Sequence, residues 1–175
     1  MADAVVIPGR MFGPGAPLLM YTGDLARIRG ATVHRHEWTA TPPTDPATQE
    51  PWVRAQLGPL PGDRPLLIGK SLGSNAAGLA ADHDLPAVWL TPLLTHPGVV
   101  AALDRATAPF LLIGGTADPS WDAELARRLT PHVFEVADAD HGLYVPGLLT
   151  ASIAVLAQVV DATAEFLDEI GWPHK

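Results

Sequence analysis

The sequence predicts one α/β domain over residues 1–175, with a mainly parallel sheet of about six strands flanked by helices on both faces. Strand-like and helix-like segments alternate along the whole chain, which is typical of a parallel sheet covered by helices. Nearly all the strand-like segments lack charge, as expected where both faces of a sheet are buried. The 175 residues also lie close to the roughly 150 expected for one domain.

Each predicted strand is a short apolar run bounded by turn-forming or polar residues. The first run stops at Pro8-Gly9, and the second is rich in β-branched residues. In chain order, the predicted strands are residues 4–7, 31–36, 65–68, 87–90, 110–113 and 132–136.

The segments between the strands predict helices at about residues 17–29, 52–57, 72–82, 99–105 and 121–129. The last helix has the clearest pattern, because apolar residues recur at spacings of three and four from Leu149 to Ile170. Asp161, Glu165 and Asp168 lie off that stripe, so the stripe should face the core. Residues 39–51, rich in Thr and Pro, are interpreted as a surface loop within the domain.

Composition excludes several classes of protein. Lys and Arg number 11 against 19 Asp and Glu, a net charge of −8, whereas a nucleic-acid binder needs a surplus of cations. The chain has no Cys, which excludes disulfides, thiolate metal sites, iron–sulfur clusters and a Cys nucleophile. That composition suits a reducing cytosol.

Neither export nor membrane insertion is expected. Asp3 stands where a secretory signal would carry basic residues, and the apolar stretch at the N-terminus stops at Pro8. No formal charge falls between Gly142 and Val160, but Pro146 and Gly147 interrupt the stretch. The remaining helical part is expected to fall short of the about 20 residues that a spanning helix needs. We therefore expect a cytoplasmic protein without a membrane partner.

One predicted strand leads directly into a motif that is typical of a catalytic serine. Residues 65–68 lead into Gly69-Lys70-Ser71-Leu72-Gly73, and small residues follow as a predicted helix. This G-x-S-x-G pattern between a strand and a helix is typical of a nucleophilic serine exposed on a tight, strained turn. The alternative is an ordinary connection in which Ser71 caps the helix. A phosphate-binding P-loop would need glycine at the position of Arg64 and a loop where a strand is predicted.

A serine hydroxyl needs a base, and the base needs an acid that fixes its tautomer. Asp118 follows the predicted strand 110–113, and His141 follows the strand 132–136. The carboxyl ends of parallel strands are where such sheets place their ligands. The chain order Ser71, Asp118, His141 is that of the α/β-hydrolases and differs from both major serine-protease orders.

At these residues the chain resembles the α/β-hydrolase superfamily, and within it a small, lidless, single-domain serine hydrolase of esterase type. The resemblance extends from Val5 to about Ile170 and implies a minimal α/β-hydrolase fold. It implies Ser71 as nucleophile, His141 as general base and Asp118 as orienting acid. Since the sequence begins at the strand that typically comes third, a six-stranded core is expected.

The resemblance also implies an oxyanion hole made of two backbone N–H groups. The N–H of Leu72 is one of them. The second comes from the loop after the first strand, at Arg10 or Met11, and these two residues are left as alternatives. Pro8 stands where members of the family often have His.

Several other polar residues have competing interpretations. Asp122 is an alternative orienting acid, although it lies in a predicted helix. Asp138 and Asp140 are interpreted as solvated loop charges, and Lys70 as a residue at the solvent or the rim of the site. His96 is open between a structural role and a place at the pocket mouth. The cluster Asp82-His83-Asp84 has metal-ligand chemistry but no further spaced ligands.

We therefore expect a serine hydrolase that cleaves carboxylic esters or related small acyl substrates without a cofactor or metal. A non-catalytic binding or scaffold protein, and lyase or acyl-transfer chemistry on the same triad, stay open as alternatives. The segment 91–98 is too short for a cap, so compact acyl groups are expected. A roof from a homodimer partner or from the loop Met11–Pro17 is the alternative.

Overall fold

The structure, a computed structural model that describes residues 2–173, is built on one six-stranded sheet. The strand order is β2-β1-β3-β4-β5-β6, and every neighbouring pair is parallel. This confirms the predicted α/β class, with a sheet that is parallel throughout rather than mainly parallel. The strands are β1 (Asp3–Ile7), β2 (Thr32–Arg35), β3 (Leu66–Lys70), β4 (Ala87–Leu90), β5 (Phe110–Gly115) and β6 (Val133–Val136).

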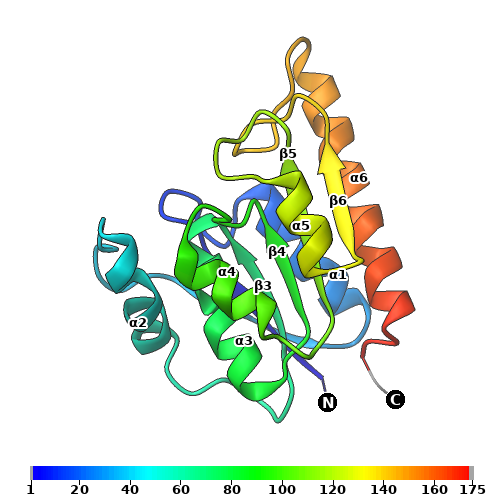
Figure 1. Cartoon of the computed structure of the whole chain (residues 1–175). Helices are drawn as coiled ribbons and strands as arrows, with labels where there is room; N and C mark the ends of the chain where they lie inside the picture. The colour runs from blue at the N-terminus through cyan, green and yellow to red at the C-terminus, as the bar shows by residue number, and fades with distance from the viewer. Residues whose placement is uncertain (1, 174–175) are drawn as a thin grey trace.

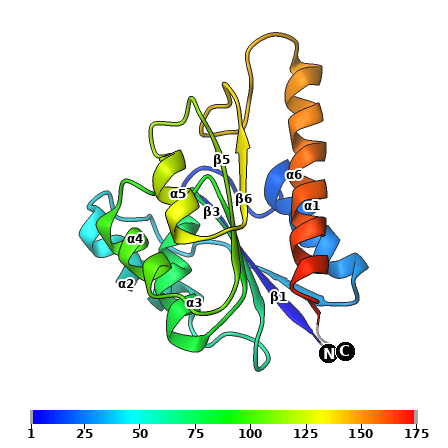
Figure 2. The same cartoon turned by 45° about the vertical axis from the view of Figure 1, so that its right-hand side comes forward.

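Helices cover both faces of the sheet, each over its own hydrophobic core (Figures 1 and 2). On one face lie α1 (Pro17–Ile28) and α6 (Leu149–Glu169). On the other lie α2 (Pro46–Leu57), α3 (Ala77–His83), α4 (Pro97–Asp104) and α5 (Ala123–Leu129). Because both faces are covered, the central strands β3, β4 and β5 are buried at every residue, which explains their apolar sequences.

Helix α2 begins earlier than the sequence analysis predicts. It starts at Pro46 rather than at residue 52, so the second half of the predicted loop 39–51 is helical. Asp45 is its N-cap, and the side chain accepts a hydrogen bond from the Ala47 amide at 3.0 Å. An Asp N-cap followed by Pro in the first turn is a favourable helix start, and these residues carry that signal.

The predicted helix 72–82 is divided into two parts. A 3-10 helix, η1 (Ser71–Ala76), leaves β3, and the α-helical turns of α3 follow it. The tighter first segment keeps Ser71 at the very start of the helical region, directly after the strand.

Helix α6 has 21 residues and extends over the segment predicted from Leu149 to Ile170. Because it continues past Asp161 and Glu165, the expectation that it would be too short to span a membrane was wrong. By length and composition alone, it is the one helix in residues 2–173 that could cross a membrane. The buried face of α6 differs from the predicted stripe: Val155, Val159, Thr163, Phe166 and Leu167 are buried, whereas Leu149 and Ile153 of the stripe are exposed.

The direction in which strands are added to the sheet reverses once, at β1. From β1 the sheet grows to β2 on one side and to β3 on the other, so the loops that leave β1 and β3 diverge at a topological switch point. Ligand sites in open parallel sheets lie at such points, outside the carboxyl ends of the strands. The loop after β1 and the turn that carries Ser71 meet there.

Candidate active site

Ser71 is the first residue of η1 and lies on a strained turn directly after β3. Its φ of 51° is in the left-handed region, which is uncommon for a residue with a side chain. The glycines on either side are needed for space. A Cβ on Gly69 would lie 2.6 Å from Cζ3 of Trp89, and a Cβ on Gly73 would lie 2.7 Å from the carbonyl oxygen of Ile7.

The structure brings Ser71, His141 and Asp118 together in one hydrogen-bonded row. The Ser71 Oγ lies 2.7 Å from His141 Nε2, and the His141 Nδ1 lies 2.7 Å from Asp118 Oδ2. A carboxylate only accepts hydrogen bonds, so Nδ1 carries the proton and Nε2 is left to accept from the serine. This is the tautomer that a base acting on Ser71 requires.

Asp118 is held in place as well as buried. The residue is only 3% exposed, and its other oxygen accepts a hydrogen bond from the Ser120 amide at 2.8 Å. Burial alone would raise the pKa of Asp118, but the hydrogen bonds from His141 and Ser120 outweigh it and keep the pKa below its usual value. The carboxylate is therefore charged when it faces the imidazole.

The loops that carry the acid and the base are bonded to each other. The amide of Ala117 donates to the carbonyl oxygen of Ala139 at 3.0 Å. A Cβ on Gly115 would collide with that same carbonyl, so the close approach of the two loops requires glycine at the end of β5. The hydrogen bond between His141 and Asp118 depends on this contact.

Of the two acids considered from sequence, only Asp118 contacts His141. Asp122 is instead the N-cap of α5, where its side chain accepts from the Leu125 amide at 2.9 Å. Asp140 is exposed, as its interpretation as a solvated loop charge predicts, but it also has a structural role. It shapes the loop of His141, because its Oδ1 accepts from the amides of Gly142 and Tyr144 at 2.7 and 3.0 Å.

Lys70 was expected at the solvent or the rim, and this expectation was wrong. Its side chain is fully buried on the last residue of β3, although it directly precedes Ser71. Its Nζ donates to the Thr91 Oγ1 and to the backbone carbonyl of His141, both at 2.9 Å. It also lies 4.5 Å from the centre of the Phe12 ring. The second position of the motif, between Gly69 and Ser71, is thus part of the site.

The loop after β1 reaches the nucleophile through Gly9. A Cβ on Gly9 would lie 3.6 Å from the Cβ of Ser71, so the backbone passes very close to the serine. Arg10 and Met11 follow, and the sequence analysis left their backbone N–H groups as the alternatives for the second oxyanion donor. The Arg10 guanidinium donates to the carbonyls of Pro42 and Pro43, and Met11 is 91% exposed. Leu72, whose N–H is the other predicted donor, is the second residue of η1, directly after Ser71.

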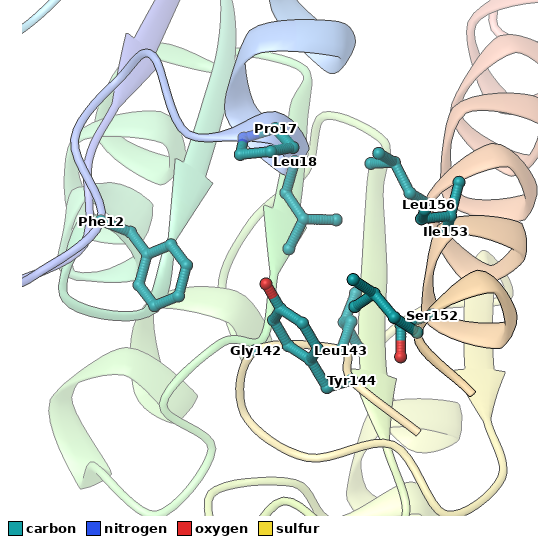
Figure 3. A pocket seen from close by; sticks show the side chains of 10 residues that line it. Phe12, Pro17, Leu18, Gly142, Leu143, Tyr144, Ser152, Ile153 and Leu156 are labelled. Atoms are coloured by element: carbon teal, nitrogen blue, oxygen red, sulfur yellow. The ribbon is translucent and has the colours of Figure 1, made fainter. Parts of the chain in front are cut away.

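An apolar cavity of about 120 Å³ opens beside the loop of His141 (Figure 3). Phe12 borders it on the side of the β1 loop, and Ile153 and Leu156 border it on the side of α6. The full lining consists of Phe12, Pro17, Leu18, Gly142, Leu143, Tyr144, Leu149, Ser152, Ile153 and Leu156. The loop Met11–Pro17 thus supplies a wall through Phe12 and Pro17, whereas Met11 does not reach the cavity.

The other sequence candidates are used structurally. Asp82 bonds to Arg54 and Arg105, and Asp84 bonds to Arg64, so the Asp82-His83-Asp84 cluster forms ion pairs rather than a metal site. Among residues 2–173, no group of three His, Asp or Glu side chains is placed to hold a metal ion. His96 is the N-cap residue of α4, and it is not among the residues that line the apolar cavity. The strand at 66–70 also rules out the P-loop.

No protein-family model matches the sequence, and no curated protein matches it. Similarity appears among solved structures. A putative hydrolase of the α/β superfamily from Xanthomonas campestris pv. campestris is 22% identical, with a TM-score of 0.72 over 97% of this chain and 99% of its own. Est1E from Butyrivibrio proteoclasticus, solved with ferulic acid bound, is 13% identical, with a TM-score of 0.70 over 97% and 89%.

A third similar structure is an α/β serine hydrolase without a lid, also from Xanthomonas campestris. It is 18% identical, with a TM-score of 0.63 over 96% of this chain and 81% of its own. At these identities the likeness concerns the arrangement of helices and strands. The chain therefore has the fold of the α/β-hydrolases, in a form with six parallel strands.

Proposed function

We propose that this protein is a serine hydrolase that cleaves carboxylic esters or related small acyl compounds. The observation that supports the proposal is the hydrogen-bonded arrangement of Ser71, His141 and Asp118. His141 lies 2.7 Å from both the serine and the aspartate, and the serine is on a strained turn. A structural serine at a helix start requires neither a neutral imidazole on its hydroxyl nor a buried carboxylate behind that imidazole. An acyl-transfer site requires both.

The proposed reaction begins when His141 Nε2 takes the proton of Ser71 and Oγ attacks the carbonyl carbon. The charge on the carbonyl oxygen is stabilised by backbone N–H groups, which we assign to Leu72 and to Arg10 or Met11. His141 then gives its proton to the leaving alcohol, which leaves an acyl group on Ser71. In the second half, His141 activates a water that hydrolyses the acyl-enzyme and releases the acid. Asp118 keeps the imidazole oriented and stabilises its charged form throughout.

A fluorophosphonate probe tests this proposal directly, because it reacts covalently only with an activated serine. We expect the native protein to gain one probe adduct, located at Ser71 by peptide mass spectrometry. The Ser71→Ala and His141→Ala variants should gain none. If folded native protein is not labelled, the row is unproductive and the scaffold alternative is favoured. Labelling without ester turnover would favour acyl transfer to an acceptor other than water.

The proposed substrates carry short or compact acyl groups. The apolar cavity beside the loop that carries His141 holds about 120 Å³, less than the roughly 150 Å³ of an engineered cavity that accommodates benzene. A longer chain would leave the cavity, and each methylene contributes about 0.8 kcal/mol only where it is removed from water. Binding should therefore stop improving after a few carbons.

A ladder of p-nitrophenyl esters from acetate to decanoate measures this limit. We expect kcat/KM to rise over the first members and then to level off or fall. Replacing Leu156, on the α6 wall, with alanine enlarges the cavity and should move the optimum to longer acyl groups. A kcat/KM that still rises at decanoate in the native protein would contradict the prediction and indicate a roof supplied by a second copy of the chain.

A further inference from the structure

Lys70 has no part in the proposed reaction, yet it lies at the centre of the site. It is the only residue with a formal charge in the central strands β3, β4 and β5, and its side chain is fully buried. Removing a charge from water is costly unless hydrogen bonds replace the hydration. A lysine is therefore a poor choice at this position for packing alone.

The groups around the Lys70 Nζ are those that a charged ammonium needs. An ammonium has three N–H donors and accepts nothing. Two of the donors meet the Thr91 Oγ1 and the His141 carbonyl oxygen, each at 2.9 Å. The third side faces the Phe12 ring, whose centre is 4.5 Å from Nζ, within the range of a cation–π contact.

These three partners come from three different segments of the site. Thr91 is the residue after β4, His141 lies on the loop after β6, and Phe12 lies on the loop after β1. The contact to His141 is made by its backbone carbonyl, so it fixes the main chain from which the imidazole extends. Phe12 lies on the loop that passes Ser71 and also borders the apolar cavity.

We propose that Lys70 is a positioning residue of this site, whose ammonium holds the backbone of His141 and the Phe12 loop in their reactive arrangement around Ser71. The inference rests on the proposed function, since it concerns the efficiency of the same three residues. Lys70 does not contact substrate and takes no proton in the reaction.

The proposal implies that activity depends on the protonation of Lys70. Burial lowers the pKa of Lys70, and the charges of Asp118 and Asp140 raise it. Burial is the larger effect, so the pKa is lowered to about 8. These two carboxylates act on Lys70 from the loops after β5 and β6, whereas His141 contacts it through the backbone carbonyl. Above that pH the neutral amine turns a lone pair toward one of its three acceptors. The contact should then weaken, and activity should fall on the alkaline side.

The lowered pKa of Lys70 also determines how the stability of the fold changes with pH. The pKa of lysine in an unfolded chain is about 10.4, above the folded value of about 8. Between these two pH values the unfolded state binds more protons, so stability rises with pH, and at neutral pH the buried ammonium is destabilising. Removing the charge should keep or raise the melting temperature while it lowers activity. A residue that only supports the fold would lower both.

The experiment compares Lys70→Met, a neutral side chain of similar length, with the native protein and with Arg64→Met. Arg64 lies beyond the opposite end of β3, bonded to Asp84, so that variant removes one positive charge away from the site. For Lys70→Met we expect kcat for p-nitrophenyl acetate to fall by about 10-fold to 100-fold, the scale of a misplaced catalytic group. KM should change little, the alkaline decline should disappear, and the melting temperature at pH 7 should stay or rise. Arg64→Met should keep the native kcat and pH profile.

Thr91→Val provides a second, milder variant that keeps Lys70. It removes one acceptor from the ammonium, so the alkaline decline should move to lower pH. Unchanged kcat and pH profiles in both variants would overturn the proposal. So would a lowered melting temperature in Lys70→Met with kcat and KM affected in parallel and the alkaline decline retained.

A separate readout distinguishes failure of this proposal from failure of the proposed function. In the ligand-free protein, the imidazole resonances of His141 can be followed by NMR through the alkaline range. The native protein should show a transition near the titration of Lys70 that Lys70→Met lacks. If the fluorophosphonate probe does not label the protein but this transition is present, Lys70 positions His141 and only the hydrolase proposal fails. If the transition is absent from the native protein, the positioning role is wrong.

Discussion

Replacing Ser71 with alanine is expected to lower kcat for an activated ester by about 1,000-fold or more, because the three residues act as a unit and the nucleophile has no substitute. The other serine near the turn, Ser74, uses its hydroxyl to donate to the Ser71 carbonyl at 2.6 Å and to accept from the Leu93 amide. It is therefore not free to replace Ser71. The substitution removes one oxygen and leaves the turn otherwise unchanged, so the fold should persist.

The matched control for this variant is Thr107→Ala. It also removes one hydroxyl, but this hydroxyl bonds to Asp84 and lies before β5, at the other end of the sheet. The control should keep native turnover, and circular dichroism should show both variants folded. If Ser71→Ala retains more than about a tenth of native activity, the acyl-enzyme mechanism is wrong.

Asp118→Asn is expected to lower kcat by about three to four orders of magnitude without unfolding the protein. The asparagine oxygen can still accept from the Ser120 amide, so the side chain should keep its place. Its NH₂ group then faces His141 Nδ1, which must become the acceptor. The proton moves to Nε2, where it faces Ser71, and the imidazole no longer acts as a base.

Asp122→Asn is the control for this second variant, since Asp122 was the competing acid in the sequence. Asparagine and aspartate are about equally good N-caps, so α5 and the melting temperature should be nearly unchanged. Activity should be native, because Asp122 bonds to the Leu125 amide and not to His141. A damaging Asp122→Asn together with a mild Asp118→Asn would reverse the assignment of the acid.

The parts of this protein that the sequence predicts well are those set by local pattern. All six strands are found within about two residues of their predicted bounds, since a short uncharged run between turn residues has few alternatives. The turn of Ser71 and the loops of Asp118 and His141 follow from the same strands. Parallel strands place their carboxyl ends together, so residues at those ends are predicted to meet.

The contacts of Lys70 and Asp140 could not be predicted in this way. A lysine in a motif looks solvated, and its burial depends on acceptors 21 and 71 residues away along the chain. The carboxylate of Asp140 bonds within its own loop, but only because that loop turns back on itself. The start of α2 is a different case. Its Asp-Pro signal is local, and the abundance of Thr and Pro around it outweighed that signal in the interpretation of residues 39–51.

The one-sided arrangement of the parallel sheet also determines where this protein tolerates modification. The residues of the candidate site leave the strands at one end, whereas the turns at 58–64, 84–86 and 105–109 enter them at the other. A label, a linker or an inserted peptide at 58–64 would therefore be separated from Ser71 by the full length of β3. This turn is a suitable place to immobilise the protein or attach a fluorophore with the reactive edge left accessible to solvent.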